Sequence, residues 1–375
     1  MNRNLNLLMA AVGVIGANSL VLGPVSPSVG AALGRPAADV MLAAAGFGAV
    51  TALSALVLAP WIDRIGAARA IRLAFAALTL GLLLCGAAPS FGWLVAGQAI
   101  AGLASGVALP AAYALAAELA PPGRAAEALG RVLTGWTLAM VFGVTLSAVL
   151  ADLVHWRAVF ALAALGAGSL ALVRLPNRPG GPVTPPWSAL PRPGVARGLL
   201  AQAAMMTAFY GTYSFLGAHF ERIGVPTLWG ALPVLAYGIG FGLAGRFDPW
   251  LDRHGYGGAG PWVFGAVALS LLALAGGAGS LWTLVPAFFA WGLANHLGLG
   301  LLVGRLTQAG GAQKGAVLGL NTAVTYLAVV AGAAGFRPVF EGGGFALCAG
   351  VGAGLAALLA VEAISRRGSR PAAPA

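Results

Sequence analysis

Apolar stretches about as long as a membrane helix fill this chain from end to end. A helix needs about 20 consecutive apolar residues to cross the hydrocarbon core of a bilayer. Only 8% of the residues are charged and 59% are apolar, whereas ordinary soluble domains are about a quarter charged. A soluble enzyme and a disordered chain are therefore both excluded. Turn-rich or charged points divide the sequence into twelve predicted spans, at 5–28, 39–60, 67–88, 92–118, 127–152, 155–175, 196–219, 226–247, 259–279, 281–307, 313–335 and 343–364.

A proline-rich segment divides the twelve spans into two sets of six. Seven prolines lie between Leu175 and Pro193, and proline prevents a helix there and stiffens the chain into an extended linker. Both cysteines, Cys85 and Cys348, lie inside apolar stretches, which excludes a disulfide framework and a cysteine-based zinc site. The expected domains are a first bundle (1–175), a cytoplasmic linker (176–195), a second bundle (196–364) and a cytoplasmic tail (365–375).

The basic residues predict the orientation in the membrane. With the N-terminus inside, seventeen of the 21 lysines and arginines fall on the cytoplasmic side. The other four are Arg35, Arg157, Arg222 and Arg337. Cytoplasmic loops of membrane proteins carry such an excess of positive charge. The net charge of +11 therefore reports topology and does not indicate nucleic-acid binding. Both termini are expected in the cytoplasm.

The two sets of six spans share motifs at a constant offset. Asp63-Arg64-Ile65-Gly66 follows the second span, and Asp252-Arg253-His254-Gly255 follows the eighth. The pair Leu129-Gly130 recurs as Leu318-Gly319, and the step from Leu129 to Leu318 equals the step from Asp63 to Asp252. A parallel duplication of a six-helix unit accounts for this register.

With these motifs the chain resembles the major facilitator superfamily over essentially its whole length. Its Asp63-Arg64-Ile65-Gly66 matches the core of the family signature in loop 2–3, and Trp156-Arg157-Ala158-Val159-Phe160 matches W-R-x-x-F between helices 5 and 6. The stretch from Ala117 to Gly130 resembles the bacterial arabinose and drug efflux permeases. The resemblance implies two six-helix bundles that rock around a central cavity, exporting small organic molecules in exchange for protons.

Two positions depart from the efflux branch. That branch usually carries an arginine on helix 4, four residues before a glycine, and here Gln98 precedes Gly102 at this spacing. Antiporters usually carry G-P-x-x-G-G on helix 5, whereas this chain has Gly143 followed by Val-Thr-Leu-Ser-Ala. Both departures bear on proton antiport and leave the fold unaffected.

The two repeated tetrapeptides are candidates for a conformational latch. A carboxylate near the N-terminus of helix 11, in the case of Asp63, or of helix 5, in the case of Asp252, gains roughly 0.3–1 kcal/mol from the helix dipole. Breaking these contacts would bias the transporter between its open-in and open-out states. The alternative for the same residues is a solvated turn with a helix cap. The predicted latch residues are Asp63, Arg64, Gly66, Asp252, Arg253 and Gly255.

His296 is the candidate for proton coupling. The tenth span places Asn295 and His296 near the bilayer midplane, and histidine changes charge between about pH 5 and 8. The alternative is a neutral histidine that bonds two helices together. All ten acidic residues fall in loops or near span ends, so no midplane carboxylate is expected to carry a proton or to neutralise a strongly cationic solute.

Polar and aromatic residues at comparable depth predict the solute cavity. The resemblance assigns helices 1, 4, 7 and 10 to its lining, assisted by 2, 5, 8 and 11. Unpaired amides are costly in hydrocarbon, so these side chains should face one another or the cavity. The predicted cavity residues are Asn18, Gln98, Trp136, Tyr210, Trp291, Asn295, His296 and Asn321.

The sequence therefore predicts a secondary transporter of the bacterial inner membrane that exports a small organic solute by alternating access. It acts as a monomer among lipids, with protons as the candidate coupling ion and with no cofactor, metal or nucleic-acid partner. Uptake of a small metabolite, or its facilitated passage, is the alternative that the residues leave open. A membrane-embedded transferase would need carboxylate pairs at a membrane face to hold a metal, and no such pair occurs.

Overall fold

The computed structural model describes residues 2–121, 124–177 and 185–365, and within these ranges it contains helices and no strands. We call residues 2–177 the first half and residues 185–365 the second half. The first half consists of α1 (Asn2–Leu33), α2 (Ala37–Val57), η1 (Ala59–Trp61), α3 (Ile62–Ile65), α4 (Ala67–Gly86), α5 (Phe91–Leu119), α6 (Ala125–Leu138), the π-helix η2 (Ala139–Val144), α7 (Thr145–Leu153) and α8 (Trp156–Ala171).

The second half begins with a short 3-10 turn and continues with long helices. Its elements are η3 (Pro186–Ala189), α9 (Val195–Tyr213), α10 (Leu216–Arg222), α11 (Thr227–Leu243), η4 (Ala244–Phe247), α12 (Asp248–Gly276), α13 (Leu281–Gly310), η5 (Gly311–Gln313), α14 (Lys314–Val330), the π-helix η6 (Ala331–Gly335) and α15 (Arg337–Ser365).

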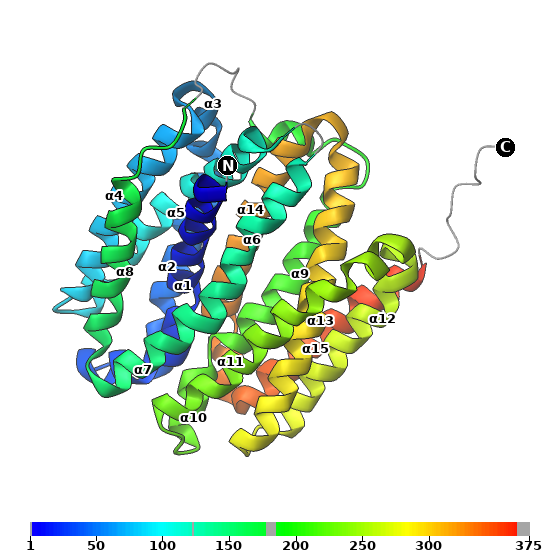
Figure 1. Cartoon of the computed structure of the whole chain (residues 1–375). Helices are drawn as coiled ribbons and strands as arrows, with labels where there is room; N and C mark the ends of the chain where they lie inside the picture. The colour runs from blue at the N-terminus through cyan, green and yellow to red at the C-terminus, as the bar shows by residue number, and fades with distance from the viewer. Residues whose placement is uncertain (1, 122–123, 178–184, 366–375) are drawn as a thin grey trace.

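The long helices lie side by side between two faces of the molecule (Figure 1). We call the face where α1 begins and α3 lies the terminal face, and the face where α7 ends and α10 lies the opposite face (Figure 1). Of the expected linker and tail, residues 178–184 and 366–375 lie outside the described ranges. The described ends of the linker are attached: Asn177 donates to the carbonyl of Ile65, and Arg192 donates to the carbonyl of Ala309.

Nine helical stretches in the described ranges are long and apolar enough to cross a membrane. One of them, Thr227–Gly276, is 50 residues long and includes a non-helical residue, Gly255. The apolar helix α8 is shorter than these stretches, with 16 residues. The helix α9, with 19 residues, is not among the nine. These spans belong to a multi-pass membrane protein.

Glycine breaks the helices at equivalent points of the two halves. Gly66 and Gly255, the last residues of the two repeated tetrapeptides, have φ of 85° and 60°. Gly34 after α1 and Gly224 after α10 have φ of 64° and 70°. Glycine adopts such values without the Cβ clash that other residues meet, so it ends a helix at little cost. The duplicated sequence register is thus accompanied by a duplicated backbone conformation.

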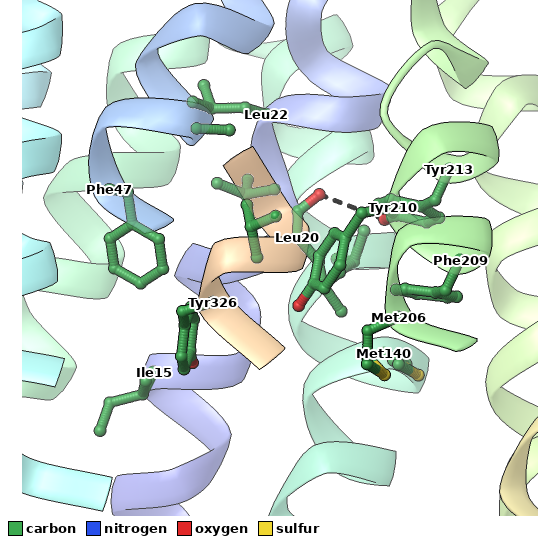
Figure 2. Close-up of a cluster of buried hydrophobic side chains, with 14 of the residues drawn as sticks. Ile15, Leu20, Leu22, Phe47, Met140, Met206, Phe209, Tyr210, Tyr213 and Tyr326 are labelled. Atoms are coloured by element: carbon green, nitrogen blue, oxygen red, sulfur yellow. Dashed lines mark hydrogen bonds between the residues drawn. The ribbon is translucent and has the colours of Figure 1, made fainter. Parts of the chain in front are cut away.

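Glycines allow close approach between the two halves. A Cβ on Gly48 of α2 would lie 2.8 Å from the Tyr326 carbonyl oxygen on α14. A Cβ on Gly238 of α11 would lie 2.8 Å from Val141 Cγ2 on η2. The step in sequence from one glycine to the other is close to the offset of the repeat. Apolar side chains from α1, α2, η2, α9 and α14 fill the space between these two contacts (Figure 2).

Candidate functional site

Tyrosines gather where the two halves meet. Of the six in the chain, Tyr210 and Tyr213 lie on α9, Tyr237 on α11, Tyr326 on α14 and Tyr113 on α5. The rings of Tyr210, Tyr213 and Tyr237 all pack against the Phe209 ring. Figure 2 shows Tyr210, Tyr213 and Tyr326 directed toward the space beside α1. This tyrosine cluster marks the centre of the candidate site.

Two of these hydroxyls connect the halves directly. The Tyr213 hydroxyl donates to the carbonyl of Leu20 at 3.2 Å, drawn as the dashed line in Figure 2. The Tyr326 hydroxyl lies 3.3 Å from Ser19 Oγ, and its ring packs edge-on against Phe47. Neutral hydrogen bonds are individually worth about 0.5–1.5 kcal/mol, so such contacts can form and break during a conformational cycle.

The predicted cavity residues of the first half pair with each other. Asn18 Nδ2 donates to Gln98 Oε1 at 3.3 Å, and Gln98 Nε2 donates to Asn18 Oδ1 at 3.2 Å. Both side chains are buried. Trp136 Nε1 donates to the Tyr113 hydroxyl at 3.1 Å. Gln98, at the position where the efflux branch usually carries arginine, is therefore one partner of a neutral amide pair.

In the second half, aromatic rings surround the predicted residues. Trp291 is fully buried against Phe209, Tyr237 and Phe288. Asn295, one turn further along α13, donates through Nδ2 to the Tyr237 hydroxyl at 2.6 Å. Tyr210 is buried beside the Phe209 ring, and Asn321 is half-buried on α14. Trp136, Trp291 and Asn295 thus contact members of the tyrosine cluster, to which Tyr210 itself belongs.

His296 has a carboxylate partner that the sequence did not reveal. Its Nε2 lies 3.1 Å from Asp248 Oδ1, and its ring packs edge-on against Phe241. Asp248 is the first residue of α12, and the sequence also placed it at a helix end. Because α11 and α12 both pack against α13, Asp248 lies beside His296 of α13. Its side chain is 52% exposed, whereas that of His296 is 25% exposed. The pair therefore combines a half-buried imidazole with a carboxylate that solvent reaches.

Ion pairs occupy the two faces of the molecule. Near the terminal face, Glu362 of α15 binds Arg197 of α9 at 2.8 Å and Arg305 of α13 at 3.3 Å, and it accepts a hydrogen bond from Tyr256. At the opposite face, Asp39 of α2 binds Arg337 of α15 at 2.8 Å. The first cluster lies within the second half, whereas the second pair joins the two halves.

Close packing at the opposite face is reinforced by Gly217 of α10. A Cβ there would collide with the Gly23 carbonyl of α1, with Ser26 and with Pro27. Beside this contact, α1, α7, α10 and α11 enclose a cavity of about 280 Å³ that includes Asp152 and Glu221. Toward the terminal face, α6 contacts α11 where Thr137 lies against Gly242. One turn earlier on α6, Leu133 and Thr134 are exposed. At the opposite face the halves thus touch at Gly217, beside this cavity.

The predicted latch residues are only partly described. The side chain of Asp63 lies outside the described part of the chain. The guanidinium of Arg64 lies 4.7 Å from the centre of the Trp61 ring. Gly66 has a positive φ, and Asn177 accepts a hydrogen bond from the backbone of Arg69 beside it. Asp252 and Arg253 are exposed. The latch remains a prediction.

Within the described ranges, histidine, cysteine and carboxylate side chains form no group of three that could hold a metal ion. The buried polar side chains around the tyrosine cluster are amides and hydroxyls.

Comparison with known proteins identifies the family. The model of the Major Facilitator Superfamily matches residues 8–333. The chain belongs to this superfamily. It is therefore a membrane transport protein and not an enzyme. Its fold is also that of a solved transporter of the POT family, with a TM-score of 0.73, 12% identity, and 97% of this chain and 96% of that chain covered.

Two relatives define how far the similarity extends. The uncharacterized MFS-type transporter YwfA of Bacillus subtilis strain 168 is 27% identical over 366 residues, which cover 92% of this chain and 88% of that protein. The purine ribonucleoside efflux pump NepI of Escherichia coli O1:K1 is 33% identical over 144 residues, which cover 37% of this chain and 36% of the pump.

The sequence had missed several members of the site. Tyr113, Tyr326 and Ser19 lie in strongly apolar stretches, where an aromatic or a serine is indistinguishable from ordinary helix packing. Asp248 lies 48 residues before His296, and only the packing of α12 against α13 brings them together. No signal in a single sequence would have paired them.

Proposed function

We propose that this protein exports a small, neutral organic solute across the bacterial inner membrane by alternating access. The solute binds at the tyrosine cluster, between two six-helix units that rock against each other. The observation that carries this proposal is the distribution of polar groups. Neutral hydrogen-bonding groups from both halves line the centre, whereas ion pairs such as Asp39–Arg337 and Arg197–Glu362 lie toward the faces.

We infer twelve membrane segments from the nine long spans. Dividing Thr227–Gly276 at Gly255 gives two segments, and α8 and α9–α10 add one each. An even number puts both termini on one side, which the positive-inside rule assigns to the cytoplasm. The terminal face is then cytoplasmic, and the contact between the halves at the opposite face corresponds to a state closed to the outside.

We propose proton exchange as the driving reaction, with His296 as the site that gains and loses the proton. Asp248 stabilises the charged imidazolium by a hydrogen bond across 3.1 Å. Solvent reaches the Asp248 carboxylate, which provides a path for the proton. Protonation would tie α13 more firmly to the start of α12, and deprotonation would release it.

Purine ribonucleosides are the first solutes to test, because the aligned relative NepI is named as an exporter of them. A nucleoside also suits a centre with aromatic rings and neutral amides. We propose them for this chain on these two grounds.

The experiment is solute-library transport in proteoliposomes that contain an internal pH dye, beginning with purine ribonucleosides. Proton movement that requires a particular solute, in the opposite direction to it, would support coupled export. Movement in the same direction would establish uptake by symport, and solute flux without protons would establish a facilitator. Both results would overturn the proposed direction or coupling.

Replacement of the histidine tests the coupling site. His296→Gln should retain solute exchange but lose the proton movement that accompanies it. The matched control is His254→Gln, because His254 is exposed and bonds only the carbonyl of Trp250 on its own helix among the described residues. Full proton coupling in His296→Gln would remove His296 from the mechanism.

A further inference from the structure

The two halves satisfy their buried polar groups in different ways. In the first half, Asn18 and Gln98 use both the donor and the acceptor of their amides on each other. Hydroxyls nearby bond to backbone carbonyls of their own helices, as Thr51 does to Phe47 and Ser105 does to Ala101. The central polar side chains of this half therefore need no further partner.

The second half leaves three buried side-chain carbonyl oxygens without a hydrogen-bond partner in the described structure. They are Asn295 Oδ1, Gln202 Oε1 and Asn321 Oδ1. Asn295 and Gln202 are each 2% exposed. Their amide nitrogens donate hydrogen bonds to the hydroxyls of Tyr237 and Thr325, respectively, whereas their carbonyl oxygens accept none. A buried acceptor without a donor costs roughly as much as a lost hydrogen bond, and such groups are rare unless they have a role.

These oxygens lie on helices that line the tyrosine cluster. On α9, Gln202 lies one turn before Met206 and two turns before Tyr210, so all three residues are on one side of that helix. Asn321 is one turn before Thr325 on α14, so it lies next to the residue that Gln202 binds. Asn295 is bonded to Tyr237, a member of the cluster.

Three further buried side-chain atoms lack a partner in the described structure: His296 Nδ1, which belongs to the proposed coupling site, and two that mark a contrast. Thr212 Oγ1 and Trp156 Nε1 are also buried without a partner. Thr212 is directed toward Gly352 of α15, within the second half, and Trp156 begins α8 in the first half. Neither residue belongs to the tyrosine cluster. Thr212 therefore provides a matched control for the loss of a buried, unpartnered oxygen.

We propose that the second half recognises the solute by accepting hydrogen bonds at Asn295, Gln202 and Asn321, so that the solute must carry several N–H or O–H donors. The proposal rests on the transport function proposed above and narrows its substrate class to small neutral solutes that carry several N–H or O–H donors. The first half, whose amides are paired, contributes shape and apolar contact. A solute without donors would leave all three oxygens unpaired, and a site of this kind discriminates strongly against it.

The test is a series of solutes that lose one N–H donor at each N6-methylation and two O–H donors at the ribose. Adenosine is compared with N6-methyladenosine, N6,N6-dimethyladenosine and the 2′,3′-di-O-methyl nucleoside in reconstituted exchange. Each donor that meets one of the three oxygens should be worth about three- to tenfold in apparent affinity. Equal affinity for all members of the series would overturn the proposal.

Variants assign the donors to individual oxygens. Asn295→Leu, Gln202→Leu and Asn321→Leu should each lower the apparent affinity for adenosine about three- to tenfold. In each variant, the loss of affinity that one of the methylations causes in the wild type should disappear. Thr212→Val should leave the affinities across the series unchanged. Asn321 is half-buried, so Asn321→Leu provides a fold-preserving test if the other two variants do not assemble.

The outcomes separate this inference from the transport function. If adenosine is not moved but another library solute is, the same series is built on that solute, and only the nucleoside assignment fails. If solutes move but neither methylation nor the carbonyl variants matter, the inference alone is overturned. If no solute moves, the transport function fails and this inference fails with it.

Discussion

The amide pair Asn18–Gln98 shows how a membrane interior handles polar side chains. Each amide satisfies the other, so the pair needs neither water nor solute. Asn18→Leu leaves the buried Gln98 amide without its hydrogen-bond partner and should destabilise the protein by about 1–3 kcal/mol. The double variant Asn18→Leu, Gln98→Leu removes both polar groups and should recover most of that loss. Melting of the purified protein in detergent measures both. A double variant as unstable as the sum of the single ones would contradict a paired role.

At this scale the sequence predicts which residues are polar and deep, but not their partners. Asn18, Gln98, Asn295 and His296 were all expected at the centre on the basis of their depth in apolar spans. Asn18 and Gln98 bond each other and Asn295 bonds Tyr237, whereas His296 bonds the half-exposed carboxylate of Asp248. Whether an amide is paired or left with a free oxygen depends on helices up to 123 residues apart, as with Gln202 and Thr325. Periodicity within one span carries no information about such distances.

Single helices differ from their predicted spans where the backbone departs from α geometry. The span predicted at 127–152 is divided into α6, the π-helix η2 and α7, and the span at 313–335 ends in the π-helix η6. The two π-helices begin at Ala139 and Ala331, a step close to the offset of the repeat. Hydropathy predicts an apolar span equally well for both geometries, so only the structure reveals these turns. π-helices occur often at functional sites, and η2 carries Met140 and Val141, which meet Gly238.

Substitution of the glycines where helices of the two halves touch should shift the conformational equilibrium. Gly238→Ala places a methyl group 2.8 Å from Val141 Cγ2, and Gly217→Ala places one against the Gly23 carbonyl. Overpacking of this kind costs typically about 1–3 kcal/mol and acts on the state in which the halves touch. Both variants should therefore increase the fraction of molecules open at the opposite face. Spin-label distances across that face measure the shift. Gly265→Ala, with open space around its position, is the control, and an equal shift in it would contradict the explanation.

At the scale of the whole molecule, the ion pair Asp39–Arg337 favours the state that is closed at the opposite face, but it is too weak to hold that state alone. The two side chains are 15% and 34% exposed, so the pair is worth about 0–1 kcal/mol. About 1 kcal/mol changes a two-state equilibrium about fivefold, whereas full switching from 1:99 to 99:1 needs about 5.5 kcal/mol. Asp39→Asn should thus open the opposite face by up to about fivefold, and Arg337→Gln should do the same. Spin-label distances that respond to neither variant would remove the pair from the gate.

The orientation of the two faces yields a prediction about access from each side of the membrane. Both native cysteines are fully buried, so a single introduced cysteine reports without background. Thr134 is exposed near the terminal face, and Glu221 is exposed at the opposite face. An impermeant maleimide should label Thr134→Cys in inside-out vesicles and Glu221→Cys in right-side-out vesicles.

Transported solute provides the decisive second readout. If Thr134 lies in a gap that closes when the halves rock, saturating solute in exchange mode should slow its labelling, because part of the population then occupies the outward-open state. Arg72→Cys, exposed near the start of α4 and away from the contact between α6 and α11, should be labelled at an unchanged rate. Equal slowing at both positions would reflect a general change in the membrane preparation. Slowing at Thr134 alone requires the two halves to move relative to each other, which is the motion that alternating access depends on.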